Sequence, residues 1–386
     1  MKITDVRTFL YRAGEADRRY GPILFVRVDT DAGISGWGEG STWAGGAALI
    51  ADFGIKQVRD MLIGRDPSEI EAIWHAIYRR YTYMGSRGLP TQVLSAIDIA
   101  LWDIKGKALE RPIYDLLGGK VRETVPVYAN AWWPDGAREP QDYADAARRT
   151  VDSGHQSLKF DPFLEMAEAF YAYISGEITP EHESAGIARV AAVREAVGPN
   201  VHILIDAHGQ YDVPSAIRIA DRLAELDVAW LEEPVPPESH DALRQVRENT
   251  AVPICVGERL FTRFDFAPIL ERRLADFVMP DVCWTGGISE LRRIGALAEA
   301  HYVPLSPHNA AGPIQIAAGA HVGLTTPNFY RLEHAMGWIP VYNAPLLEPL
   351  GFERDFLTVS NSPGLGIEID EDYLEQHRYT ESETTS

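Results

Sequence analysis

Eight short apolar segments recur after Gly119, and this repeat constrains the fold more than any other feature of the sequence. From the third segment onward their starts lie about 24 to 27 residues apart, with helix-like stretches such as Ala216 to Leu226 between them. Eight strand-helix units predict a closed parallel α/β barrel rather than an open Rossmann sheet. No Gly-x-Gly-x-x-Gly follows a strand to indicate dinucleotide binding. The segments are Val125 to Ala131, Ser157 to Phe163, His202 to His208, Ala229 to Pro234, Pro253 to Glu258, Phe277 to Val282, Val303 to Asn309 and Phe329 to Ala335.

The first third of the chain has a different pattern. Segments from Ile3 to Leu10, Ile23 to Val28 and Ile34 to Trp37 predict a small antiparallel sheet. Between residues 46 and 117 apolar residues recur three and four apart, which predicts helices. Because 386 residues exceed one usual core, we expect two domains. We place an α+β domain over residues 1–120, completed by residues 345–386, and the barrel over residues 121–344.

One interval of the barrel is too long for the repeat, since about 39 residues separate its second and third strands. We interpret residues 164–186 as an inserted helix and loop beside the mouth of the barrel. Residues 18–20, Arg-Arg-Tyr, fall where a mobile loop over the barrel would be expected, but we interpret them as a solvated loop. The polar tail from Gln376 to Ser386 is expected to fray.

The formal net charge of −20 argues against nucleic acid or an anionic membrane surface as a partner. An anionic substrate would need a local cationic centre, which a bound metal ion could provide. Cys255 and Cys283 lie in apolar runs and are expected to be core thiols in a reducing cytoplasm. No signal peptide and no apolar run of roughly 20 residues is evident, so we expect a soluble cytoplasmic protein.

Carboxylates stand at the ends of three successive barrel segments. Asp206, Glu232 and Glu258 occupy these positions, where the loops of such a barrel open to solvent. Three clustered carboxylates repel one another unless a cation lies among them, and all-oxygen ligands favour Mg²⁺. We therefore predict that these residues bind magnesium. Strand alternation directs only one of Glu232 and Glu233 toward the metal, which leaves Glu233 for structural contacts.

An acid and an imidazole follow on the next two segments. Asp281 ends the sixth and His308 the seventh. A carboxylate that binds one ring nitrogen of a histidine fixes the tautomer and raises the basicity of the other ring nitrogen. The pair therefore predicts a histidine base that is oriented by the aspartate.

Together these motifs resemble the mandelate racemase branch of the enolase superfamily. The resemblance implies a (β/α)7β barrel, which is a modified TIM barrel, with an N-terminal α+β capping domain, and Mg²⁺ on Asp206, Glu232 and Glu258. It also implies a catalytic pair of Asp281 and His308, a substrate contact by Glu333, and a dimer-based homo-oligomer, often an octamer. It spans nearly the whole chain: Gly36-Trp37-Gly38-Glu39, residues 96–103, Leu231-Glu232-Glu233-Pro234, Gly257-Glu258, residues 280–287 and Leu332-Glu333-His334.

The second barrel strand departs from the racemase pattern. Racemases of this branch have Lys-x-Lys, whereas this chain has Lys159-Phe160-Asp161, which removes the obvious second base for a 1,1-proton transfer. Asp206-Ala207-His208 instead looks like the galactonate dehydratase pattern, in which the histidine helps expel a hydroxyl group.

We therefore predict an Mg²⁺-dependent lyase that dehydrates an acid sugar, a small-molecule substrate, to a 2-keto-3-deoxy acid. The alternatives are an epimerase, racemase or lactone cycloisomerase of the same superfamily, or a noncatalytic metal-binding barrel. Lys159 either helps hold the substrate carboxylate or neutralises nearby acids. Asp161 is a further substrate-binding candidate, and Trp132 either lines the pocket or packs beneath the cap.

Overall fold

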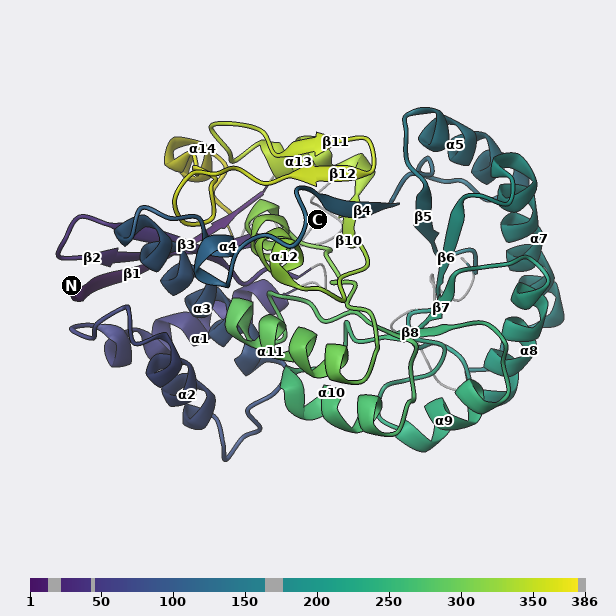
Figure 1. Cartoon of the computed structure of the whole chain (residues 1–386), viewed down its shortest axis with the longest axis horizontal. Coiled ribbons are helices and arrows are strands. Elements are labelled where there is room, and N and C mark those ends of the chain that lie inside the picture. The colour runs from purple at the N-terminus through teal and green to yellow at the C-terminus, as the bar shows by residue number, and fades with distance from the viewer. Residues whose placement is uncertain (13–21, 43–45, 164–175, 381–386) are drawn as a thin grey trace.

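The N-terminal part of the protein is a three-stranded antiparallel sheet packed against helices. The computed structural model describes residues 1–12, 22–42, 46–163 and 176–380, so the predicted loop at residues 18–20 lies outside the described residues. Figure 1 shows this sheet beside α1, α2 and α3, at one side of the barrel. The elements are β1 (Ile3–Tyr11), β2 (Ile23–Thr30), β3 (Ser35–Glu39), α1 (Ala47–Leu62), α2 (Ile70–Arg80), α3 (Leu89–Ala108) and α4 (Ile113–Leu116).

Two glycines of β3 allow that strand to lie directly on α3. A Cβ atom at Gly36 would overlap the carbonyl oxygen of Ala100, and one at Gly38 would overlap that of Ala96. The close approach buries α3 over most of its length. It also fixes the end of β3, where the side chain of Glu39 is fully buried.

The barrel is a parallel sheet that runs from β4 through β5, β6, β7 and β8 to β9, and β10 pairs with β4. Figure 1 shows its helices arranged around the outside of the strands. The predicted (β/α)7β architecture with an N-terminal α+β domain is confirmed. The strands are β4 (Val125–Asn130), β5 (Ser157–Phe160), β6 (His202–Asp206), β7 (Trp230–Glu232), β8 (Ile254–Val256), β9 (Phe277–Val278) and β10 (Leu332–Ala335). The helices are α5 (Pro140–Asp152), α7 (Pro180–Val197), α8 (Val213–Ala224), α9 (His240–Glu248), α10 (Thr262–Glu271), α11 (Gly287–Ala300) and α12 (Pro313–Thr325).

The wall between β9 and β10 differs from the sequence prediction. The seventh apolar segment, 303–309, forms isolated bridges instead of a strand: Val278 with Leu305, Asp281 with His308, and Leu305 with Phe329. Backbone hydrogen bonds from Val278 to Pro304 and from Ser306 to Val278 complete the wall there.

The predicted insertion between β5 and β6 is described only in part. Residues 164–175 lie outside the described residues. The helix and loop that we expected over residues 164–186 end earlier, because α7 begins at Pro180. Its cap explains that start: the Thr179 hydroxyl accepts a hydrogen bond from the His182 N–H, and proline is favoured in the first turn.

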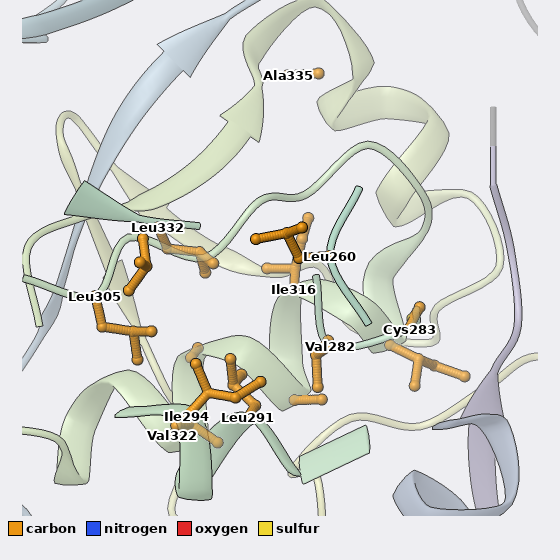
Figure 2. Close-up of a cluster of buried hydrophobic side chains, with 14 of the residues drawn as sticks. Leu260, Val282, Cys283, Leu291, Ile294, Leu305, Ile316, Val322, Leu332 and Ala335 are labelled. Atoms are coloured by element: carbon orange, nitrogen blue, oxygen red, sulfur yellow. The ribbon is translucent and has the colours of Figure 1, made fainter. Parts of the chain in front are cut away.

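Buried hydrophobic side chains of the protein form two separate clusters. Figure 2 shows part of the outer core, where side chains of α11 and α12 gather with Leu305 and Leu332 of the wall. Cys255 and Cys283 are both buried free thiols, as predicted. A separate cluster of buried side chains from the barrel strands lies apart from this outer core. Its members are Tyr128, Leu204, Trp230, Cys255 and Met279.

The C-terminal segment returns to the N-terminal sheet. The Tyr379 N–H donates to the Leu10 carbonyl at 2.8 Å, and the Arg12 N–H donates to the His377 carbonyl at 2.9 Å. These contacts support the proposal that residues 345–386 complete the N-terminal domain. No helix in the described ranges is long and apolar enough to cross a membrane. The C-terminal elements are the short helix η3 (Met336–Trp338), α13 (Ile339–Asn343), β11 (Gly351–Glu353), β12 (Phe356–Thr358) and α14 (Glu371–Gln376).

Candidate active site

Three carboxylates lie at neighbouring strand ends of the barrel. Asp206 is the last residue of β6 and pairs in register with Glu232, the last residue of β7. Glu258 follows β8 by two residues. All three are nearly excluded from solvent, with exposed fractions of 3%, 0% and 3%. The alternation of strand side chains thus brings together the three residues that the sequence singles out.

The ammonium group of Lys159 lies among these carboxylates. Its Nζ atom is 3.1 Å from Asp206 Oδ2, 2.8 Å from Glu232 Oε1 and 2.9 Å from Glu333 Oε1. Burial disfavours the charged amine, but the charges of Glu232 and Glu333 outweigh it and raise the pKa of Lys159 well above its ordinary value. These ion pairs fit the neutralisation of nearby acids, and a contact of Lys159 with the substrate carboxylate stays a prediction.

Lys159 and His208 do not neutralise all of the negative charge of these carboxylates. Burial and then the adjacent charge of Asp206 raise the pKa of Glu232 well above its usual range. The pKa of Asp206 shifts the other way, because His208 and Lys159 outweigh the effect of burial. The opposite shifts show that the two neighbouring carboxyl groups compete for the same positive charges.

A divalent cation fits this donor set chemically. The ligands are all carboxylate oxygens, which suit Mg²⁺, and the raised pKa of Glu232 indicates an excess of negative charge among them. Among the described residues, no group of three or more acidic, histidine or cysteine side chains is arranged so that it could hold a metal ion. The Lys159 ammonium instead bridges Asp206 and Glu232.

His308 and Asp281 form the predicted pair across adjacent wall segments. His308 Nδ1 lies 2.7 Å from Asp281 Oδ2, and its Nε2 lies 3.1 Å from Glu258 Oε2. Burial lowers the pKa of His308, but the charge of Glu333 and the contacts of Asp281 and Glu258 raise it to about 9. Because the shift comes from these negative charges, added positive charge among them would return the imidazole toward its neutral, basic form.

His208 lies beside another member of the carboxylate cluster. Its Nε2 is 3.5 Å from Asp206 Oδ2, and its Nδ1 is 3.2 Å from Asp161 Oδ2. Its pKa is raised to about 9 because Asp206 and Asp161 overcome the effect of burial. The side chain keeps a quarter of its surface exposed, so it can meet a bound molecule. Asp161, predicted as a substrate contact, is therefore placed to orient His208.

His208 also adopts an uncommon backbone conformation, with φ of 50°. The Arg259 guanidinium donates to the His208 carbonyl oxygen and forms an ion pair with Glu233, at 3.1 Å. Glu233 thus makes the structural contacts that strand alternation predicted. Sequence reasoning missed Arg259, although its position directly after Glu258 was a usable signal.

Glu333 is held by groups from the first barrel strand. Its Oε1 accepts from the Asn130 amide at 2.7 Å, and its Oε2 accepts from the Tyr128 hydroxyl at 3.0 Å. Neither residue was singled out in the sequence. Asn130 could have been found by the rule that led to Asp206, because it is the polar residue that ends its strand.

Trp132 packs inside an aromatic cluster. Its ring lies 5.3 Å from that of Phe160 and 6.3 Å from that of Tyr143 in α5, and its indole N–H donates to the Lys159 carbonyl at 2.8 Å. The packing role is therefore visible, between the barrel strands and α5 rather than beneath the cap. Its role in substrate binding stays a prediction.

Comparison with known proteins places this arrangement in a family. Residues 16–118 match the N-terminal domain of the mandelate racemase/muconate lactonizing enzyme family, and residues 142–373 match the enolase C-terminal domain-like family. The D-gluconate dehydratase of Thermoproteus tenax is 35% identical over 99% of this chain and 75% of its own length. The D-xylonate dehydratase of Haloferax volcanii is 35% identical over 97% of this chain and 89% of its own length.

Solved structures agree with the sequence matches. A mandelate racemase/muconate lactonizing enzyme-like protein from Rubrobacter xylanophilus has a TM-score of 0.88 at 35% identity, and the match covers 98% of each chain. A member of the enolase superfamily from Salmonella Typhimurium has a TM-score of 0.90 at 32% identity, over 97% of this chain and 98% of the other. The chain therefore belongs to the enolase superfamily, in its mandelate racemase branch.

Proposed function

We propose that the protein is an Mg²⁺-dependent sugar acid dehydratase, a hydro-lyase that converts an aldonate to a 2-keto-3-deoxy acid. The names of its relatives, which include dehydratases of D-gluconate, D-galactonate and D-xylonate, support this substrate class. The observation that carries the proposal is a pair of histidines, His308 and His208. Each is bonded through Nδ1 to an aspartate and directs Nε2 toward the carboxylate cluster. Removal of a proton and expulsion of a hydroxyl group require two such groups.

Mandelate racemase-type proteins are generally Mg²⁺-dependent, and Asp206, Glu232 and Glu258 are the residues that would hold the ion. When bound, the cation would supply positive charge that stabilises the substrate carboxylate as its neighbouring carbon loses a proton. The remaining chemistry belongs to the side chains of this chain.

His308 acts as the base. Its Nε2 accepts the proton from C2, while Asp281 holds the Nδ1–H and so fixes the tautomer with a free Nε2 lone pair. The electron pair of the C2–H bond first forms an enediolate with C1. It then forms the C2–C3 double bond as the C3–O bond breaks.

His208 acts as the acid. Its Nε2 gives its proton to the departing C3 hydroxyl, which leaves as water, and Asp161 stabilises the protonated ring through Nδ1. The resulting enol tautomerises to the 2-keto-3-deoxy acid. Lys159 remains protonated and keeps Glu232 and Glu333 in place.

Epimerisation, racemisation and lactone cycloisomerisation are the competing reactions of the same scaffold. A racemase of this branch would use a second base on β5. Here the Lys159 amine is paired with three carboxylates and keeps its proton, and Asp161 is bonded to His208. These contacts favour elimination.

A library of mono- and diacid sugars with Mg²⁺ in D₂O, followed by proton NMR, tests the proposal. Dehydration gives a 3-deoxy ketoacid that carries deuterium at C3. Epimerisation gives exchange at C2 without loss of the hydroxyl group. If no acid in the library is converted or exchanges its C2 proton with solvent, the result favours a noncatalytic metal-binding barrel.

A further inference from the structure

The Asp281 carboxylate accepts hydrogen bonds from three donors, and only one of them, His308, belongs to the catalytic pair. Its Oδ1 accepts from the Cys283 N–H at 2.7 Å, and its Oδ2 accepts from His308 Nδ1 at 2.7 Å. The same Oδ2 also accepts from the side-chain amide of Gln315 at 2.5 Å. Three donors on a buried carboxylate fix its rotation about the Cβ–Cγ bond, and so fix the direction from which it meets the imidazole.

Gln315 is placed for this single contact. It is the third residue of α12 and is only 1% exposed. Because a carboxylate only accepts hydrogen bonds, the amide must turn its NH₂ group toward Asp281. Its Oε1 atom is then buried without a partner among the described residues. An uncompensated polar atom of this kind indicates a side chain retained for its donor rather than for packing.

A residue of the N-terminal domain sets the position of Gln315. Glu39 Oε1 accepts from the Gly312 N–H at 2.5 Å, and Glu39 Oε2 accepts from the Gln315 N–H at 2.9 Å. Helix α12 has no side-chain cap of its own, so Glu39 serves as the cap of its N-terminus. A Cβ atom at position 312 would lie 2.6 Å from the carboxylate, which explains the glycine there.

A second contact from the same segment reaches the other side of the imidazole. The carbonyl oxygen of Ser41 accepts from the indole N–H of Trp284 at 2.9 Å, and the Trp284 ring lies 4.9 Å from that of His308. Glu39 at the end of β3 therefore contacts Gln315, behind Asp281, and Ser41 two residues later contacts Trp284, beside His308.

We propose that Gln315 is a positioning residue for the base His308, acting through Asp281, and that Glu39 of the N-terminal domain positions Gln315. The inference rests on the proposed dehydratase function, in which His308 takes the C2 proton. It makes the catalytic base of the barrel dependent on the domain that docks on it.

Three variants test the chain of contacts. Gln315→Met keeps the shape of the side chain and removes the donor, and Glu39→Gln keeps the shape and disrupts one of its two acceptor contacts. Asp98→Asn is the matched control. Asp98 is also a buried carboxyl group of the N-terminal domain, and it accepts from the Ser289 N–H at 3.0 Å, at the start of the neighbouring helix α11.

For the holoenzyme with Mg²⁺, we expect Gln315→Met and Glu39→Gln to lower kcat roughly tenfold to a hundredfold, the usual effect of losing a group that orients a histidine. KM should stay within about twofold, because the substrate contacts remain. Asp98→Asn should lower the Tm about as much as Glu39→Gln while kcat changes less than about twofold. An unchanged kcat in Gln315→Met, or equal losses of kcat in Glu39→Gln and Asp98→Asn, would overturn the proposal.

A readout without substrate separates this proposal from the proposed function. In protein labelled with ¹⁵N-histidine, the His308 Nδ1–H resonance is identified by its absence from His308→Gln. It should move in Gln315→Met and Glu39→Gln and stay in place in Asp98→Asn. The same position in all three variants would reject the positioning role. A wild-type protein that dehydrates no acid sugar would reject the function and leave this comparison valid.

Discussion

Glu232 lies at the centre of the carboxylate cluster, with Lys159 on one oxygen and the indole N–H of Trp230 on the other, at 2.8 and 3.2 Å. Burial and the charge of Asp206 together raise the pKa of Glu232 well above its usual value, so a negative charge is costly at this position. A neutral amide of the same shape removes this charge and loses one of the two donor contacts, so its net cost to stability should be small.

We predict that Glu232→Gln leaves the Tm within a few degrees of wild type and lowers kcat by at least about a hundredfold, because a charged cation ligand is lost. Circular dichroism and the NMR dehydration assay measure the two effects. The exposed Glu238→Gln in the following loop is the control for the substitution itself. Full activity in Glu232→Gln, or in wild type after complete chelation, would contradict the metal assignment.

The two histidines should separate in D₂O, because proton removal at C2 and hydroxyl loss at C3 are distinct steps. We expect His308→Asn to stop both C2 exchange and elimination. His208→Asn should stop elimination while slow C2 exchange continues, since the base pair with Asp281 is intact. Proton NMR of the C2 and C3 signals measures both. Near wild-type elimination in His208→Asn would show that another group is the acid.

At the scale of elements, α7 lies so close to the end of β5 that it leaves no room for a side chain at Gly186. A Cβ atom there would overlap the ring of Phe163, which is itself fully buried. Phe163 also donates its backbone N–H to Asp161 Oδ1 at 2.9 Å. The packing of this helix is thus connected to the carboxylate that orients His208.

Gly→Ala inside a helix ordinarily stabilises by about 1 kcal/mol, but here we predict the reverse. Gly186→Ala should destabilise the protein by about 1–3 kcal/mol, the usual cost of overpacking. Gly295→Ala in α11 is the control, because its nearest neighbours, side-chain atoms of Leu305 and Thr326, lie at 3.3 and 3.4 Å and can adjust. Urea unfolding of both variants provides the comparison, and a more stable Gly186→Ala would refute the packing argument.

At the scale of the whole molecule, His321 joins three parts of the chain. Its Nδ1 accepts from the Tyr114 N–H of α4 at 3.2 Å, and its Nε2 donates to the Leu365 carbonyl of the C-terminal segment at 3.0 Å. The ring itself belongs to α12 of the barrel. Because Nδ1 must accept, this contact requires the neutral imidazole, and burial lowers the pKa of His321 to about 4.

The pH dependence of stability follows from this shift. In the unfolded chain a histidine binds its proton below a pH of about 6.5, so the free energy of unfolding should fall as the pH drops from about 6.5 toward 4. The full contribution of His321 is about 3 kcal/mol. Burial raises the pKa of Glu39 and Asp98 to about 7, and their contribution runs the other way, present at low pH and lost as the pH rises through about 7.

The measurement is therefore a comparison with His321→Gln. We expect this variant to be less stable than wild type at pH 7 and to lose less further stability between pH 6.5 and 4. Urea unfolding at several pH values gives both slopes. Parallel slopes would show that His321 does not keep its neutral form in the fold.

The sequence by itself determined the barrel, the N-terminal sheet and the residues that meet at the strand ends. These follow from local patterns: apolar spacing distinguishes strands from helices, and a polar residue directly after a strand must point out of the barrel mouth. The role of Asp161 beside His208 was open, because its partner lies 47 positions away and becomes a neighbour only when β5 and β6 pair.

Tertiary structure alone decided where charges and caps from distant segments meet. The apolar pattern at 303–309 predicts a strand, but its ladder is reduced to single bridges by the geometry of its neighbours. Lys159 has three acidic partners only because the barrel closes, and Glu39 reaches Gln315 across 276 positions because the domains dock. Such contacts depend on the relative placement of elements, which no periodicity within one segment encodes.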